Sequence, residues 1–142
     1  DGSRWRLGLR NPFDTEGYLG VLEIADAAVV TSGSYERYFI GDDGKRYGHI
    51  IDPATGYPAE SGLASVTIVA KEGKLCDALS TSLFIMGREK AEGYWREHGD
   101  FEMILITDEG ELYITEGISD AFSLSGGFGN MEVHVVGKEK GE

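Results

Sequence analysis

The sequence of 142 residues contains one cysteine, Cys76, so it can form no disulfide within the chain. Without a second cysteine or clustered histidines, it also lacks the ligand spacing of a structural zinc site. Basic residues are scarce: 13 lysines and arginines stand against 25 aspartates and glutamates, a formal net charge of −12. This charge repels nucleic acid phosphates and anionic lipid surfaces, so we expect neither as a partner. No apolar run approaches the roughly 20 residues of a membrane-spanning helix.

Proline is rare as well, with 3 residues, whereas glycine contributes 21, a composition that indicates short elements joined by tight turns. The length fits one domain, and no internal repeat is present. We expect residues 1–136 to fold as one unit and residues 137–142 to form a flexible tail. The chain starts with aspartate rather than methionine, and we expect it to be a piece of a longer protein.

Alternating apolar and polar side chains predict strands over much of the chain. The patterns cover residues 5–9, 18–24, 27–31, 35–40, 47–51, 65–69, 102–107 and 112–115. Glycine-containing turns at residues 40–45 and 108–110 predict two hairpins, because glycine tolerates positive φ. Apolar residues then recur every three or four positions in residues 74–86, before Gly87, and in residues 88–98, before Gly99. The expected fold class is α+β, with a mixed, largely antiparallel sheet and two central helices.

The first predicted helix carries Asp77, Ser80 and Thr81, three polar residues that share a face because positions three and four apart are neighbours on a helix. A carboxylate and a hydroxyl one turn apart can both give oxygen atoms to Mg²⁺, which completes its octahedron with water or substrate phosphates. The alternative is structural. Asp77 then lies in the first helical turn and offsets the helix dipole, while Thr81 donates back to the carbonyl of Asp77.

A second candidate site is the segment of residues 47–58, which ends a strand and enters a loop with the pattern His-x-x-Asp-Pro-x-Thr-Gly. His49 leads into this loop, and an imidazole is well suited to accept a proton at neutral pH. Equally, His49 can be a structural donor, and the rest of the pattern can be only a turn.

Three further features carry weaker signals. The hydroxyl-rich residues 31–34 follow an apolar strand, and such a strand end can line a nucleotide pocket or form an ordinary turn. Residues 125–129 are glycine-rich but precede a strand, so they fail the context of a dinucleotide-binding loop and are interpreted as a turn. His98 and His134 lack a comparable context and are interpreted as structural.

Taken together and in this order, these segments resemble the FAD:protein FMN transferases, the ApbE-type flavin transferases. The resemblance runs from about residue 5 to residue 115 and corresponds to the C-terminal half of the family's catalytic domain. It rests on five blocks: residues 5–12, residues 30–33 with 35–37, residues 49–56, residues 65–67, and residues 77–81 followed by Phe84 and Gly87.

The resemblance implies a Mg²⁺-dependent reaction that cleaves FAD at its pyrophosphate, esterifies FMN to a Thr or Ser of an acceptor flavoprotein and releases AMP. By that likeness Asp77 and Thr81, with Ser80 adjacent, fall on the metal ligands, and His49 is a candidate base. The likeness assigns to the flavin nucleotide pocket Thr31, Ser32, Gly33, His49, Ile50, Asp52 and Thr55. The acceptor is expected to be a subunit of a membrane redox complex. The protein is expected to be a lipoprotein at the outer face of the bacterial inner membrane.

Two alternatives remain open: a Mg²⁺-dependent FAD pyrophosphatase that yields FMN and AMP, and a noncatalytic flavin-binding module. The chain also departs from the family pattern. Cys76 stands where a small residue such as alanine is common, a change that the small apolar thiol tolerates. The segment of the family's N-terminal half that gives a backbone carbonyl to the metal has no counterpart here. We therefore expect the isolated chain to carry part of the site and to be inactive alone.

Overall fold

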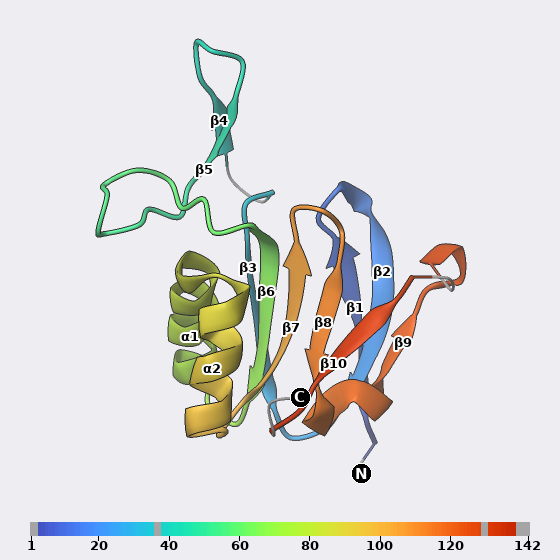
Figure 1. Ribbon diagram of the computed structural model, residues 1–142. Coiled ribbons are helices and arrows are strands. Elements are labelled where there is room, and N and C mark those ends of the chain that lie inside the picture. Colours follow the sequence, from blue (N-terminus) through green and yellow to red (C-terminus); the bar gives the residue numbers. More distant parts are fainter. Residues whose placement is uncertain (1–2, 36–37, 129–130, 139–142) are drawn as a thin grey trace.

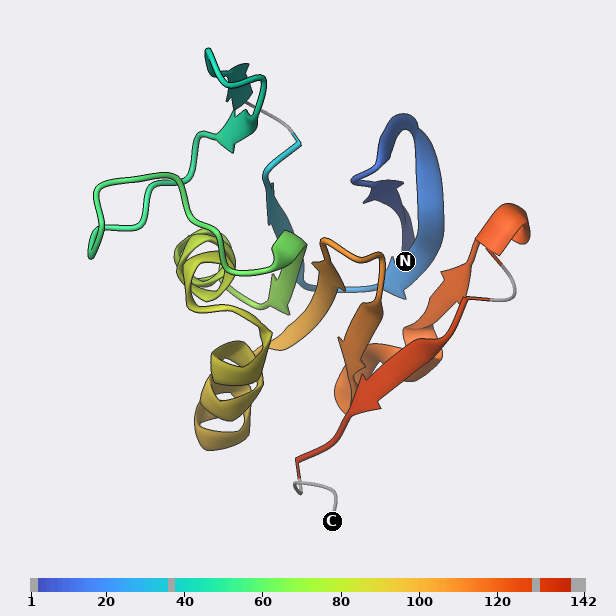
Figure 2. The same cartoon turned by 45° about the horizontal axis from the view of Figure 1, so that its top comes forward.

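The computed structural model describes residues 3–35, 38–128 and 131–138. It confirms the α+β class. Helices α1 (Gly73–Met86) and α2 (Arg88–His98) cover one face of a five-stranded sheet, and a three-stranded sheet lies against the other face (Figure 1). Figure 2 shows the same three layers after a tilt that brings the upper end of the molecule forward.

The five-stranded sheet lies between the two other layers. Its neighbouring strands are antiparallel except for the parallel pair formed by the last strand and its neighbour. In spatial order the strands are β10 (Val133–Val136), β8 (Leu112–Thr115), β7 (Glu102–Thr107), β6 (Leu63–Ala70) and β3 (Ala28–Gly33). Strand β6 is buried along its whole length because it has a layer on each face.

The second sheet has the order β1 (Trp5–Asn11), β2 (Asp14–Ile24) and β9 (Phe122–Leu124). Its inner residues, such as Leu22, form one apolar cluster with Ile104 and Ile114 of the central sheet. A 3₁₀ helix, η1 (Glu116–Ala121), leads from β8 to β9. The turn expected at residues 125–129 contains a second 3₁₀ helix, η2 (Gly126–Phe128), and its last residue lies outside the described residues.

A hairpin of strands β4 (Tyr38–Ile40) and β5 (Arg46–Gly48) projects beyond the layers, beside the long loop that continues to β6 (Figure 1). Strand β4 covers the second half of the predicted residues 35–40, of which Tyr35 lies in a turn, and β5 is shorter than predicted. Residues 36 and 37 lie outside the described residues, and β5 ends at Gly48 rather than at residue 51. The chain turns there because the Asp52 N–H donates to the Tyr57 carbonyl over 2.9 Å, which leaves Ile51 in an isolated bridge with Pro58.

The helices have nearly the predicted bounds, with α1 starting one residue earlier, at Gly73. Their apolar faces pack on the central sheet in a cluster that includes Leu83 and Trp95, both fully buried. In the part of the chain that the structure describes, no helix is long and apolar enough to cross a membrane.

The expected tail begins in contact with α2. Arg96 Nε donates to the Gly137 carbonyl over 3.0 Å, and Lys138 Nζ donates to the Trp95 carbonyl over 3.0 Å. These two bonds join the end of α2 to the residues that follow β10. They hold the C-terminal strand against the helical layer. Residues 139–142 lie outside the described residues.

Candidate functional site

The three polar residues of α1 have different surroundings. Asp77 and Thr81 are exposed, whereas Ser80 is completely buried. Among the described residues, none forms a hydrogen bond or ion pair with the Asp77 carboxylate. An unpaired carboxylate and an exposed hydroxyl therefore lie one helical turn apart.

The structural alternative for these residues is wrong in both of its parts. Because α1 begins at Gly73, Asp77 is its fifth residue, and the first turn of the helix contains no acidic side chain. The hydroxyl that donates to the Asp77 carbonyl is that of Ser80, over 3.1 Å, and not that of Thr81. Neither dipole compensation in the first turn nor back-bonding by Thr81 explains why these residues stand here.

Strand β3 faces this part of α1 with Ser32. The Ser32 Oγ lies 2.8 Å from Ser80 Oγ and 3.4 Å from Thr81 Oγ1. Residues 31–33 thus belong to a strand, although residues 27–31 alone were predicted as one. Three hydroxyls from two elements meet at the contact between α1 and β3, and one of them, Ser80, donates to the backbone carbonyl of Asp77.

Thr31 and Gly33, predicted for the same pocket, have other positions, because successive residues of a strand point to opposite faces. Thr31 Oγ1 lies 2.8 Å from Thr67 Oγ1, and both residues line a cavity of about 310 Å³ between β1 and β3. Gly33 is buried against the Tyr35 ring, where an added Cβ would collide with that ring. The structure therefore brings Ser32, and not Thr31, to the residues of α1.

His49 is exposed at the start of the long loop, and its neighbour Ile50 is buried among the residues of the helical layer. The loop is fastened at two further points: the Ala59 N–H donates to the Ile50 carbonyl over 2.8 Å, and the Ser61 hydroxyl donates to the Phe84 carbonyl in the last part of α1. On the other side of His49, a Cβ on Gly48 would lie 3.5 Å from the Ser34 Cβ. His49 is thus held next to the end of β3, near the strand that carries Ser32.

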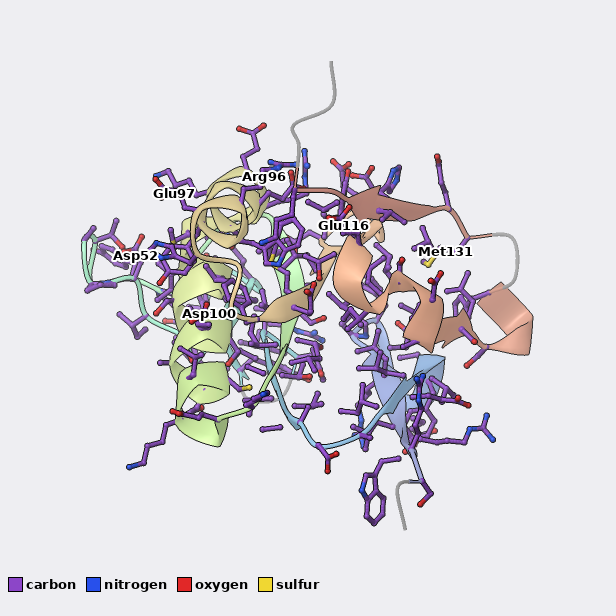
Figure 3. The ribbon with its side chains drawn as sticks, turned by 90° about the horizontal axis from the view of Figure 1, so that it is seen from below. Asp52, Arg96, Glu97, Asp100, Glu116 and Met131 are labelled. Carbon is purple, nitrogen blue, oxygen red and sulfur yellow. The ribbon has the colours of Figure 1, made fainter. Side chains whose placement is uncertain are left out.

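Asp52 and Thr55 build the turn of this loop. Asp52 Oδ1 accepts from the Ala54 N–H over 2.9 Å, and Thr55 Oγ1 accepts from the Tyr57 N–H over 3.2 Å. Figure 3 shows Asp52 at the outer edge of the molecule, in the loop beyond α1. Both residues also line a cavity of about 440 Å³ between the loop and the β4–β5 hairpin, with Lys45, Tyr47, Tyr57, Pro58 and Glu60.

The polar contacts of that hairpin were not predicted from the sequence. Lys45 Nζ lies 2.6 Å from Glu60 Oε1, and the Tyr47 hydroxyl donates to Asp43 Oδ2 over 2.6 Å. The bond from Tyr47 lowers the pKa of Asp43 and raises the pKa of Tyr47, while the bond to Glu60 raises the pKa of Lys45. Asp43 and Lys45 lie in the turn that precedes β5, and the predicted turn at residues 40–45 already placed them within a few residues of Tyr47.

The two remaining histidines lie in ring contacts. The His98 ring centroid is 4.1 Å from that of Tyr94 within α2, and His134 stacks on Tyr113 across the parallel pair β8 and β10, with centroids 4.7 Å apart. Their positions agree with a structural interpretation.

The donor atoms at α1 suit a hard cation. Asp77 and Thr81 offer a carboxylate and a hydroxyl oxygen, the ligand types that Mg²⁺ prefers. Within residues 3–35, 38–128 and 131–138, no group of three or more His, Cys, Asp or Glu side chains could hold a metal. An ion at Asp77 and Thr81 would accordingly keep open positions for water or for phosphate oxygens.

Comparison with known proteins bears on the family of the chain. The sequence pattern of the ApbE family matches residues 1–105 of the chain. A protein of Klebsiella pneumoniae (strain 342) named FAD:protein FMN transferase is 40% identical over 112 residues, which make up 78% of this chain and 35% of that protein. One of the same name from Treponema pallidum is 40% identical over 117 residues, 82% of this chain and 32% of that protein. The chain thus spans about a third of the length of the curated relatives it matches.

Solved structures give the same result. The crystal structure of the ApbE protein from Thermotoga maritima is similar with a TM-score of 0.75 and 35% identity, over 84% of this chain and 38% of that chain. The flavin transferase ApbE from Vibrio cholerae follows with a TM-score of 0.68 and 31% identity, over 82% of this chain and 37% of that chain. The likeness covers most of the layers described above.

Proposed function

The chain belongs to the ApbE family, and we propose that its protein transfers FMN from FAD to a Ser or Thr hydroxyl of an acceptor flavoprotein and releases AMP. The relatives named FAD:protein FMN transferase support flavin transfer as the activity. The observation that carries the proposal is the pair of Asp77 and Thr81, whose oxygen atoms stand exposed and one turn apart on α1.

In the proposed reaction, the acceptor oxygen attacks the phosphorus of the FMN half of FAD. A new phosphoester bond forms while the bond from that phosphorus to the bridging oxygen of the pyrophosphate breaks. AMP leaves with the bridging oxygen, and the proton lost by the acceptor hydroxyl balances the new terminal oxygen of AMP. Such a transfer depends on positioning and on neutralising the phosphate charge.

The charge to be neutralised is that of the phosphates, and a chain with a net charge of −12 is poorly suited to do this with its own side chains. We assign Mg²⁺ to Asp77 and Thr81, since the exposed carboxylate and hydroxyl fit its preference for oxygen ligands. When bound, the ion would offset the negative charge of the pyrophosphate. Ser80, the third residue of the predicted set, is fully buried and its hydroxyl is engaged by Ser32 and the Asp77 carbonyl. We therefore assign Ser80 to the support of Thr81.

His49 is the proposed base for the acceptor hydroxyl. His49 is exposed and so accessible to a substrate. The next residue, Ile50, is buried in the core and fixes the backbone from which the imidazole extends. Ser32, Ile50, Asp52 and Thr55 lie on the two segments that meet near His49, and we assign them to the side of the flavin nucleotide. Thr31 and Gly33 would act from behind β3, by holding the strand.

We further propose that the acceptor belongs to a membrane redox complex and that the protein acts as a lipoprotein at the outer face of the bacterial inner membrane. Family membership is the support for both. That the 142-residue chain alone is inactive stays a prediction, which its coverage of about a third of the relatives' length supports.

The test is to incubate the full-length protein with FAD, Mg²⁺ and a purified flavoprotein acceptor, and to follow AMP by chromatography and covalent flavin by in-gel fluorescence. Transfer gives equal amounts of AMP and labelled acceptor. Free FMN with AMP and an unlabelled acceptor would instead establish a pyrophosphatase, and bound FAD without AMP would establish a noncatalytic flavin-binding module.

Variants connect this assay to the site. Asp77→Ala should abolish Mg²⁺-dependent AMP release, whereas Ser82→Ala, an exposed hydroxyl deletion on the same helix, should leave it unchanged. His49→Ala should slow AMP release while FAD still binds. Equal loss of binding and turnover in His49→Ala would give His49 a role in binding or folding instead.

A further inference from the structure

The hydroxyls at the contact between α1 and β3 form a continuous chain that ends on a carbonyl. Thr81 Oγ1 lies 3.4 Å from Ser32 Oγ, Ser32 Oγ lies 2.8 Å from Ser80 Oγ, and Ser80 Oγ lies 3.1 Å from the Asp77 carbonyl oxygen. Two of the four residues, Asp77 and Thr81, are the proposed metal ligands. The series of hydroxyls connects them on the side of α1 that faces β3.

The end of this chain fixes the direction of every proton in it. A carbonyl oxygen can only accept, so Ser80 donates its single proton to Asp77. Ser80 must then accept from Ser32, and this uses the single proton of Ser32. Toward Thr81, Ser32 has only lone pairs left, so the Thr81 hydroxyl is the donor of that contact.

This order has a consequence for the outer side of Thr81. Its proton points to Ser32, so the lone pairs of Oγ1 remain available to a cation, one helical turn from Asp77. A cation binds lone pairs and is repelled by a hydroxyl proton, so a hydroxyl that donates away from the ion is the better ligand. Because Ser80 is fully buried, water does not compete for its proton and the direction is stable.

We propose that Ser32 is a positioning residue of the metal site, which accepts the Thr81 proton and so leaves the lone pairs of the Thr81 oxygen available to a cation. This inference rests on the proposed function, because it takes Asp77 and Thr81 as the ligands. It gives Ser32, assigned above to the side of the flavin nucleotide, a second role behind the ligand Thr81. Its effect is on cation affinity rather than on the chemical step.

The experiment measures cation binding by the full-length protein without FAD. Mn²⁺, which takes similar oxygen ligands, is titrated and its free fraction is read by electron paramagnetic resonance. Ser32→Ala should raise the Mn²⁺ Kd about 10-fold, the lower end of what loss of a residue behind a metal ligand costs. Ser32→Thr keeps the acceptor and should restore the affinity. The matched control, Ser82→Ala, removes an exposed hydroxyl from the same helix and should bind Mn²⁺ as wild type.

Circular dichroism shows whether Ser32→Ala folds. If it does not fold, Ser80→Ala tests the same contact. Ser80→Ala releases the proton of Ser32, which can then point at Thr81, and it should also weaken Mn²⁺ binding several-fold. Folded Ser32→Ala or Ser80→Ala with wild-type affinity, while Asp77→Ala loses the ion, would overturn the inference and leave the metal site in place. Undiminished Mn²⁺ binding by Asp77→Ala would overturn the metal assignment itself.

Discussion

The Ala59 N–H donates to the Ile50 carbonyl over 2.8 Å and so closes the loop that follows His49. Ile50 is 7% exposed and belongs to the apolar cluster of the helical layer, which also contains Leu83 and Phe84 of α1. The residue next to it, His49, is exposed. The packing of Ile50 therefore helps to fix the backbone that carries the imidazole.

Ile50→Ala should accordingly lower both stability and activity. Loss of a buried isoleucine side chain costs about 2–4 kcal/mol of unfolding free energy, measured by urea denaturation. In the full-length enzyme the AMP-release rate should fall more than FAD binding does, because the anchor of the base is lost. Ile50→Val removes one methylene and should cost about 1 kcal/mol with little change in rate. A full rate in folded Ile50→Ala would contradict the dependence of His49 on this anchor.

Patterns within a segment could be predicted from the sequence, and contacts between distant segments could not. The helical periodicity predicted α1 to within one residue, and alternation predicted β6 and β7. Ser80, and not its neighbour Thr81, is buried against β3. The helix pattern alone does not show this, because the hydroxyl that Ser80 contacts belongs to Ser32, 48 residues away in the sequence. The predicted end of β5 was too late for a different, local reason, because the Asp52 N–H donates to the Tyr57 carbonyl and closes the loop.

The Asp52 carboxylate can serve in two ways: it can shape the loop by accepting a hydrogen bond, or its negative charge can contact the nucleotide. Asp52→Asn keeps an oxygen that can accept from the Ala54 N–H, and it removes the negative charge. Asp52→Ala removes both. If Asp52 serves by shaping the loop, Asp52→Asn should bind FAD as wild type, whereas Asp52→Ala should lose about 1 kcal/mol of stability and bind FAD more weakly.

Isothermal titration with FAD and thermal unfolding of both variants of the full-length protein distinguish these roles. Equal loss of FAD affinity in the two variants, with stability unchanged, would show that the charge itself contacts the nucleotide.

The hairpin contact between Tyr47 and Asp43 predicts a pH dependence. Because the Tyr47 hydroxyl and the Lys45 N–H donate to this carboxylate, its pKa in the folded protein lies below the ordinary 3.8. A lowered pKa means that the contact stabilises the hairpin above pH 3.8 and is lost as the pH falls through the folded value. Carbon-detected NMR titration of the Asp43 carboxyl should give a midpoint below 3.8, and Tyr47→Phe should move it upward. Tyr38→Phe on the neighbouring strand is the control and should leave the midpoint in place.

Cys76 reports on the contact between α1 and β3 that holds the proposed positioning residue. Its side chain is 0% exposed, and its thiol donates to the Ala28 carbonyl of β3 over 3.4 Å. Burial raises the pKa of the thiol above 9.0, so the reactive thiolate is scarce in the folded protein. The unfolded chain ionises first as the pH rises through 9.0, so this group stabilises the fold below that pH and its contribution is lost above it.

An aromatic disulfide reagent at pH 8 should therefore label Cys76 only when α1 separates from β3. The labelling rate should rise with urea in parallel with the loss of helical circular dichroism. Saturating Mn²⁺ should slow it, because Ser32 of β3 strengthens the site on α1 only while the two elements are in contact. In Asp77→Ala the slowing by Mn²⁺ should disappear while the rate without metal stays near wild type. Rapid labelling in the native protein at pH 8 would mean that the contact between α1 and β3 opens freely, and the hydroxyl chain from Thr81 to Asp77 could not then hold a fixed direction.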